Sequence, residues 1–266
     1  MQKILVFTDI HLLPEGGTII GLDPFERFTR GLAHALEKHP DAARIVLCGD
    51  LSHNAAPAEY ARLNQALETC PLPVSLMLGN HDRRAPFLAA FPDVAQMETG
   101  HIQHQFDIGA HRLIFLDTLD EEAEDTHSGF LCPARLTWLD QALDEAGERR
   151  VIVFTHHPPI ETGFKGMDLI GLKNRSDLIA RLAAQGNVVQ IVSGHIHRTV
   201  LGSAGGIPVA ILKSPCHQMP MALGYQDTSL SIDEPGAYGI LLLTDEGVIV
   251  HTEDFTLPPN PSAAYT

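Results

Sequence analysis

The sequence predicts an α/β protein in which helices cover two central β-sheets. Apolar runs rich in Val, Ile and Leu recur along the chain, and each ends in a small or polar residue: 3–8, 44–48, 73–78, 150–155 and 188–193. Runs of this kind are typical of strands that are buried on both faces. Helical periodicity separates the first three runs, which is the pattern of a βαβαβ unit.

The other elements follow from local patterns along the chain. Helices are predicted at about 24–38 and 57–69, the second opening at Pro57. Alternating apolar residues and a turn at Gly109 predict an antiparallel hairpin over 102–117. Helical periodicity returns at about 133–146 and 174–184, and short strands are expected near 198–202, 207–212, 238–243 and 247–254.

Length and local composition predict one main domain with a short C-terminal addition. We expect a catalytic domain at 1–213, followed at 214–256 by an irregular cap or oligomerisation segment and the closing strands of the same domain. The stretch 214–236 contains three prolines and two glycines. Irregular loops of this length often cover a functional site. The Pro-rich end, 257–266, is expected to be a flexible tail.

Composition narrows the classes of partner. The chain has 33 Asp and Glu against 18 Lys and Arg, a formal net charge of −15, which disfavours long nucleic acids. It lacks an apolar run of about 18 residues, so no membrane partner is expected. Four cysteines without CxxC spacing and an N-terminus unlike a signal peptide favour a cytoplasmic protein with free thiols.

Histidine is the unusual component, and many of the fifteen histidines stand where apolar runs end. Five short polar segments occupy these positions: Asp9-Ile-His11, Gly49-Asp50, Gly79-Asn80-His81-Asp82, His156-His157 and Gly194-His195-Ile-His197. The carboxyl ends of parallel strands share one edge of a sheet, so the segments are expected to meet there. Carboxylate, imidazole and amide ligands suit Fe, Mn, Zn or Co, and they are too many for one ion.

Each of these residues also has an ordinary structural interpretation when taken alone. Asp50 after a glycine is compatible with a helix cap, Asn80 with a turn, and His156 with a hydrogen-bonded histidine of the core. Five segments in order at strand ends favour the metal site instead.

The ordered blocks D-x-H, G-D, G-N-H-D, a strand-ending H and G-H-x-H resemble the calcineurin-like metallophosphoesterase superfamily over residues 9–197. The resemblance implies a four-layer αββα sandwich of two mixed sheets and two metal ions with a bridging hydroxide as the nucleophile. It implies that His81 protonates the leaving group and that Asp82 orients the His81 ring. It implies two ligand sets sharing Asp50: Asp9, His11, Asp50 and His197 for one ion, and Asp50, Asn80, His156 and His195 for the other.

The G-N-H-D block and His156-His157-Pro-Pro resemble the class III cyclic nucleotide phosphodiesterase and glycerophosphodiesterase branch. This implies hydrolysis of a small phosphodiester, with 3′,5′-cyclic AMP first and glycerophosphodiesters second. A phosphomonoesterase, a small-scale nuclease and a non-catalytic scaffold of the same fold remain alternatives. His217, in the irregular segment, and His157, beside a predicted ligand, are candidate substrate contacts. The resemblance also implies a homodimer or higher homo-oligomer.

Overall fold

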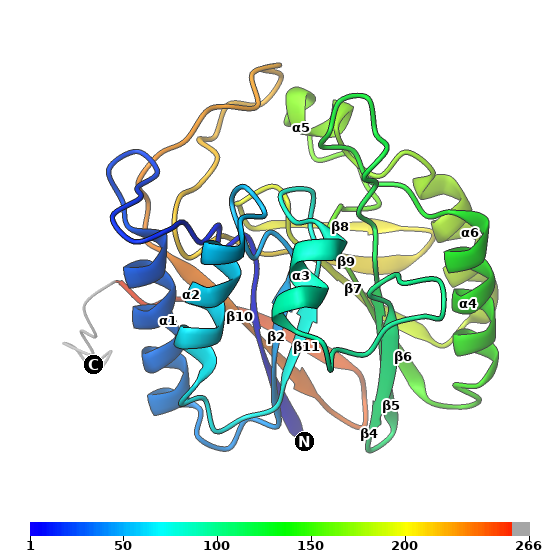
Figure 1. The fold of residues 1–266 in the computed structure, drawn as a ribbon. Helices are drawn as coiled ribbons and strands as arrows, with labels where there is room; N and C mark the ends of the chain where they lie inside the picture. The colour runs from blue at the N-terminus through cyan, green and yellow to red at the C-terminus, as the bar shows by residue number, and fades with distance from the viewer. Residues whose placement is uncertain (257–266) are drawn as a thin grey trace, which may run out of the picture.

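Two β-sheets lie face to face at the centre of the protein, which we describe from a computed structural model covering residues 1–256 (Figure 1). The predicted tail at 257–266 lies outside the described residues. The first sheet has the order β11-β10-β1-β2-β3, and the second has the order β4-β5-β6-β7-β9-β8. Both are mixed, because an antiparallel strand or hairpin extends a parallel centre at their edges.

The strands of the first sheet are β1 (Gln2–Phe7), β2 (Arg44–Cys48), β3 (Val74–Met77), β10 (Ala237–Leu243) and β11 (Val248–Asp254). Strands β1, β2 and β3 run parallel, and β10 pairs with β1 in the antiparallel direction. The closing strands thus complete the sheet that the N-terminus begins.

The strands of the second sheet are β4 (His104–Ile108), β5 (His111–Leu116), β6 (Arg150–Thr155), β7 (Val188–Ser193), β8 (Val200–Ala204) and β9 (Ile207–Ile211). Strands β5, β6, β7 and β9 are parallel, while β4 and β8 pair antiparallel at the two edges. The predicted hairpin is β4 and β5, joined at Gly109 with a φ of 58° that glycine adopts without strain.

Three apolar cores separate four layers. The core between the sheets includes Val6, Val46, Phe115 and Phe154, all fully buried. The outer face of the first sheet packs against α1 (Pro24–Lys38), α2 (Pro57–Leu67) and α3 (Arg84–Ala90). The outer face of the second packs against α4 (Pro133–Asp144), α5 (Lys165–Leu169) and α6 (Arg175–Gln185). The predicted αββα sandwich is therefore confirmed.

Helix α1 shows how local sequence fixes these layers. The Asp23 carboxylate accepts a hydrogen bond from the Phe25 amide at 2.9 Å, which caps the first turn. Phe28, Leu32 and Ala35 recur at helical spacing and are buried against the sheet. The same apolar stripe that is typical of a helix therefore packs it onto β1, through Phe7 and Phe28, and onto β10.

The segment 214–236 contains no helix or strand of its own, as predicted, apart from one bridge between Gln218 and Ile232. In Figure 1 it rises as an orange loop over the sheet edge and approaches α5. Main-chain hydrogen bonds tie it there, from Gly166 N to Tyr225 O and from Gly224 N to Gly163 O, each 2.9 Å. Helices α3 and α5 are two short elements that the sequence patterns did not predict.

Candidate metal centre

The loops that follow the parallel strands bring the predicted residues together at one edge of both sheets. After β1 and β2 the chains stay hydrogen-bonded, with Asp9 N to Gly49 O at 3.1 Å and His11 N to Asp50 O at 2.9 Å. The loop after β7 joins them, because the His195 amide donates to Asp9 Oδ1 at 3.0 Å. The site therefore spans the two sheets.

Five of the predicted ligands adopt a left-handed backbone conformation, which few residues other than glycine tolerate. Their φ values are 54°, 45°, 49°, 71° and 55° for Asp9, His11, Asp50, His195 and His197. Such strain costs about 1–3 kcal/mol per residue and persists where the surrounding structure enforces it. Because five such residues occur at this one site, the fold evidently accepts unfavourable backbone conformations in order to position these side chains.

The first predicted ligand set converges as expected. Asp9, His11, Asp50 and His197 place one donor atom each within 4.8 Å of all the others. His11 Nε2 lies 3.0 Å from His197 Nε2 and 3.5 Å from Asp50 Oδ2, and His197 Nε2 lies 3.5 Å from Asp9 Oδ1.

The second set lies beside the first and shares Asp50 with it. Asp50, His156 and His195 also hold donor atoms within 4.8 Å of one another. Asn80 completes the group, since its Oδ1 lies 3.2 Å from His156 Nε2 and 2.9 Å from His195 Nδ1. The Oδ2 atom of Asp50 lies 3.3 Å from His156 Nε2.

Main-chain groups hold the donor atoms in the orientation that a divalent ion needs. His156 Nδ1 donates to Cys48 O at 2.9 Å and His197 Nδ1 donates to His217 O at 3.2 Å. In the neutral form of each ring, the lone pair is therefore on Nε2, the atom that faces the other donors. Asp50 Oδ1 accepts from the His81 amide at 2.9 Å while Oδ2 faces the histidines. This set of oxygen and nitrogen donors fits two hard or borderline divalent ions.

Burial and mutual charge set the protonation of the two carboxyl groups. Burial raises the pKa of Asp9 to about 7, although His156 opposes the shift. Burial also opposes ionisation of Asp50, but His156, His81 and His11 outweigh it and hold its pKa well below the usual value. The carboxylates in turn raise the pKa of His156 to about 9 against the effect of burial.

His81 lies at the rim of this group, with its ring 4.6 Å from that of His11. Its Nδ1 atom donates to His53 O at 2.8 Å, so the ring is oriented by a main-chain carbonyl. The expected contact with Asp82 is not formed, which corrects the prediction that this carboxylate orients the ring. Asp82 is buried and accepts instead from the amides of Leu51, Ser52 and Gly79 at 3.0–3.1 Å.

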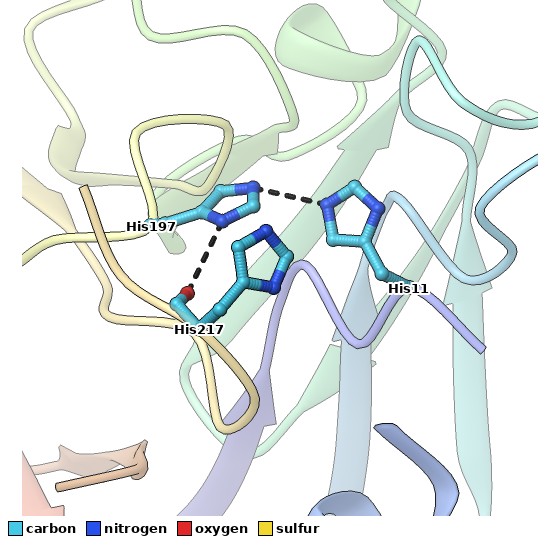
Figure 2. A group of neighbouring side chains, drawn as sticks. All are labelled: His11, His197 and His217. Carbon is cyan, nitrogen blue, oxygen red and sulfur yellow. Dashed lines mark hydrogen bonds between the residues drawn. The ribbon is translucent and has the colours of Figure 1, made fainter. Parts of the chain in front are cut away.

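His217, the candidate substrate contact of the irregular segment, lies beside two predicted metal ligands and could itself donate to an ion with them. Figure 2 shows its ring beside those of His11 and His197, with centroids 5.2 and 4.5 Å away. Its Nδ1 is buried without a hydrogen-bond partner among the described residues. Burial, with the charges of His53 and His81, lowers the pKa of His217 to about 4.

His157 occupies a different environment from the one expected of a substrate contact. Its Nδ1 bonds with Thr118 Oγ1 at 2.8 Å and its Nε2 donates to His127 O at 2.9 Å. Burial and the neighbouring His156 lower its pKa to about 3. Both ring nitrogens therefore have hydrogen-bond partners within the protein, and the ring lines neither of the two cavities described below. The prediction of a substrate contact is corrected: His157 packs inside the protein.

Two further histidines belong to the site and were not singled out from the sequence. The ring of His53 stacks on His81 with centroids 5.2 Å apart. His127 accepts from Asn80 Nδ2 at 3.1 Å, which turns the amide oxygen toward His156 and His195. His53 could have been predicted, because it follows Asp50 of the G-D motif by three residues. His127 lies in an irregular loop, where no sequence motif points to the site.

Two cavities open from the centre. The larger, about 380 Å³, has the histidines on its floor and an apolar wall that includes Ile19, Met167, Ile170 and Leu230. The smaller, about 300 Å³, is lined mainly by polar residues. In the described part of the chain no helix is long and apolar enough to cross a membrane.

Comparison with known proteins matches residues 2–199 to the family model for calcineurin-like phosphoesterases. The chain belongs to this family. The phosphoesterase is 35% identical over 255 residues to a protein named "Probable cyclic nucleotide phosphodiesterase" from Rhodopseudomonas palustris, covering 96% of this chain and 93% of the relative. It is 30% identical to the 3′,5′-cyclic adenosine monophosphate phosphodiesterase CpdA of Pseudomonas aeruginosa, covering 92% and 86%.

Another relative of this phosphoesterase is the glycerophosphodiester phosphodiesterase GpdQ of Enterobacter lignolyticus, 31% identical over 73% of this chain and 69% of the relative. Among solved structures, a dimetal phosphatase from Danio rerio superposes with a TM-score of 0.74 at 14% identity, covering 94% and 95% of the two chains. The predictions of the branch and of a metal-dependent phosphodiester hydrolase are confirmed. The family implies divalent metal ions.

Proposed function

We propose that the protein is a binuclear metal-dependent phosphodiesterase of small phosphodiesters, with 3′,5′-cyclic nucleotides such as cyclic AMP as the lead substrates. The observation that carries the proposal is the pair of donor groups that share Asp50 on the floor of a cavity. Fe, Mn, Zn and Co all suit these donors. The first ion would be held by Asp9, His11, Asp50 and His197, and the second by Asp50, Asn80, His156 and His195.

Bound divalent ions would supply a lowered pKa for coordinated water and neutralise the charge of the phosphate. The protein's own contribution is to fix the donors. Five ligands lie on loops with a left-handed backbone, and the carbonyls of Cys48 and His217 orient the rings of His156 and His197. Such preorganisation avoids rearrangement of the site during the reaction.

His81 is the residue that we assign to the leaving oxygen. Its Nδ1 proton is engaged by His53 O, so Nε2 is the nitrogen that remains for the substrate. The ring lies at both cavities, where the two ester oxygens of a bound diester would emerge. A positioned imidazole of this kind protonates a departing alkoxide.

Cyclic nucleotides are placed before glycerophosphodiesters on two grounds. Two relatives named as cyclic nucleotide phosphodiesterases combine identities of 35% and 30% with coverage of 96% and 92% of this chain. The relatives named GpdQ reach 31% identity over 73% of the chain or 24% identity over 94%. The larger cavity also offers an apolar wall for a nucleobase, including Ile19, Met167 and Leu230. Among its described lining residues, Asp50 is the only carboxylate that could receive an ammonium headgroup. Glycerophosphodiesters remain the second candidate because of the GpdQ relatives.

The substrate class is tested by turnover of four compounds on one metal-loaded preparation: 3′,5′-cyclic AMP, 2′,3′-cyclic AMP, glycerophosphoethanolamine and a phosphomonoester. Of the four compounds, we expect 3′,5′-cyclic AMP to have the highest kcat/KM. A preference for the glycerol diester or the monoester would replace the lead substrate. Absence of turnover for all four compounds would leave a non-catalytic scaffold as the better account.

A homodimer and a cytoplasmic location remain predictions. Exposed apolar side chains on and beside the irregular segment suit a contact between copies, namely Leu169, Met221, Leu223 and Tyr225. Light scattering on the full chain, compared with a Leu223→Asp variant, tests the dimer, which the variant is expected to weaken.

A further inference from the structure

The two cavities of the site differ in chemistry although they meet at the same residues. His53, Asn80, His81 and His127 line both of them. Beyond these shared residues, the larger cavity has mainly apolar walls, whereas the smaller is completed by Asn54, Ala55, Arg83 and Thr126. A phosphodiester at the shared residues would direct its two ester groups into two different environments.

Arg83 is the distinctive residue of the smaller cavity. Its Nη1 donates to Asn80 O at 2.9 Å and to Asp82 O at 2.6 Å, so main-chain carbonyls fix the guanidinium. Within residues 1–256 no carboxylate pairs with it, whereas the adjacent Arg84 pairs with Asp117 and Glu121 at 2.8 and 2.9 Å. The charge of Arg83 is thus held in place and left available to the cavity.

An unpaired positive charge beside a cavity is unusual in a protein with a formal net charge of −15, and it indicates a site for an anion. So negative a molecule repels anions unless a local cation offsets the field. Of the described residues that line the two cavities, only Arg83 carries a fixed positive charge. A guanidinium is matched in shape to phosphate oxygens, which it binds through two parallel hydrogen bonds.

We propose that the smaller cavity binds a second phosphate group through Arg83. The protein would therefore also hydrolyse short linear phosphodiesters that carry a terminal phosphate, such as a 5′-phosphorylated dinucleotide. Cyclic AMP has a single phosphate and leaves this cavity unused. A phosphorylated dinucleotide fills it, while the nucleoside on the other side of the scissile phosphate enters the larger, apolar cavity.

The inference rests on the proposed phosphodiesterase function and adds a substrate class to it. The reaction consumes one water. A bond forms between phosphorus and the water oxygen, the bond from phosphorus to one ester oxygen breaks, and that oxygen leaves as an alcohol after taking a proton. The terminal phosphate takes no part in bond making and contributes only to binding, so its effect appears as a ratio between two substrates.

The test compares diadenylate with and without a 5′-phosphate on the metal-loaded full chain. The wild type is expected to favour the phosphorylated compound in kcat/KM by about tenfold, in line with a charge-assisted hydrogen bond. Arg83→Gln should bring the ratio of the two substrates to about one, and Arg83→Lys should restore part of it. Arg30→Gln is the matched control, because Arg30 is exposed on α1 and lines neither cavity.

A binding measurement supports the kinetic one. By calorimetry, adenosine 3′,5′-bisphosphate should bind the wild type more tightly than adenosine 5′-monophosphate, and Arg83→Gln should remove the difference. The second phosphate site would be overturned if Arg83→Gln still preferred the phosphorylated dinucleotide, or if the wild type cleaved the two dinucleotides at equal rates. In either case, cleavage of cyclic AMP would still support the proposed function. Failure to cleave any diester would overturn both.

Discussion

At the scale of single residues, Asp50 links every part of the site. Its Oδ1 atom accepts a hydrogen bond from the His81 amide, and its Oδ2 atom faces His11 and His156. Burial alone would favour the neutral acid, and the surrounding histidines reverse that preference and keep the pKa low. An ionised carboxylate with one oxygen already satisfied is suited to bridge two cations, which is why the two donor groups overlap at this residue.

The role assigned to His81 leads to a prediction about leaving groups. His81→Ala is expected to lower kcat for cyclic AMP by about a hundredfold to ten-thousandfold, the usual contribution of a positioned general acid. The loss should be much smaller for a p-nitrophenyl diester, because nitrophenolate departs without protonation. Steady-state kinetics with both substrates measure the difference.

His251→Ala serves as the control for this variant, since His251 is exposed on β11. It is expected to keep the kinetics of the wild type. Equal losses for both leaving groups in His81→Ala would show that the ring binds the phosphate instead of protonating the leaving oxygen.

At the scale of elements, the loops after the parallel strands determine the site more than the strands do. Gly79 follows β3, and a Cβ there would lie 2.5 Å from Asp50 N and 2.7 Å from His156 Nε2. Real Cβ atoms do not approach other atoms so closely, so only glycine lets this loop pack against both ligand groups. The G-N-H-D block therefore combines a steric requirement with a chemical one.

Gly79→Ala is expected to displace Asp50 and His156 and to reduce both metal content and diester hydrolysis at least about tenfold, because displacements near 1 Å have large effects at such sites. Metal analysis and kinetics on the purified variant measure this. Gly247→Ala is the matched control, since a Cβ there meets nothing within 4 Å. Normal metal content in Gly79→Ala would contradict the close packing of this loop.

At the scale of the whole molecule, the sequence patterns predicted the layers well because buried strands and amphipathic helices have clear periodicities. Helices α3 and α5 were missed for the opposite reason. Helix α3 has seven residues, includes Pro86 and buries only Phe87, and α5 has five residues. Neither is long enough to show a helical stripe.

The sequence predicted the part of the candidate site that lies within recognisable motifs. The seven proposed ligands converge in the two expected groups, but the partners of Asp82, His157 and His127 depend on loop conformations that no local pattern encodes. The expected link between Asp82 and His81 failed because a buried carboxylate attracts nearby unpaired amides, and Leu51, Ser52 and Gly79 supply them.

The fold as a whole should lose stability in weak acid, and His104 contributes to that loss. Its ring stacks on Phe115 at 4.6 Å, and burial, aided by Arg44, lowers its pKa to about 4 from 6.5. Between these values the unfolded chain holds a proton that the folded chain lacks, so stability falls as the pH drops through 6.5 toward 4.

At pH 5.5 this single group should cost about 1 kcal/mol of unfolding free energy relative to pH 7.5. His104→Phe keeps the stacked ring and removes the titration, so its loss of stability between these two pH values should be smaller by that amount. Urea unfolding of both proteins at both pH values measures the difference. The same pH dependence in both would contradict the neutral, partly buried state of His104.

In the proposed function, the shared Asp50 brings two metal ions together for phosphodiester hydrolysis. The most direct test of this proposal is the metal stoichiometry of the purified chain after reconstitution with Mn, Fe, Co or Zn, measured together with cyclic AMP turnover. We expect two ions per wild-type chain, and about one ion with much reduced turnover for Asn80→Ala, while the exposed control Asn64→Ala matches the wild type. One ion or none in an active wild type, or two ions in Asn80→Ala, would contradict the account.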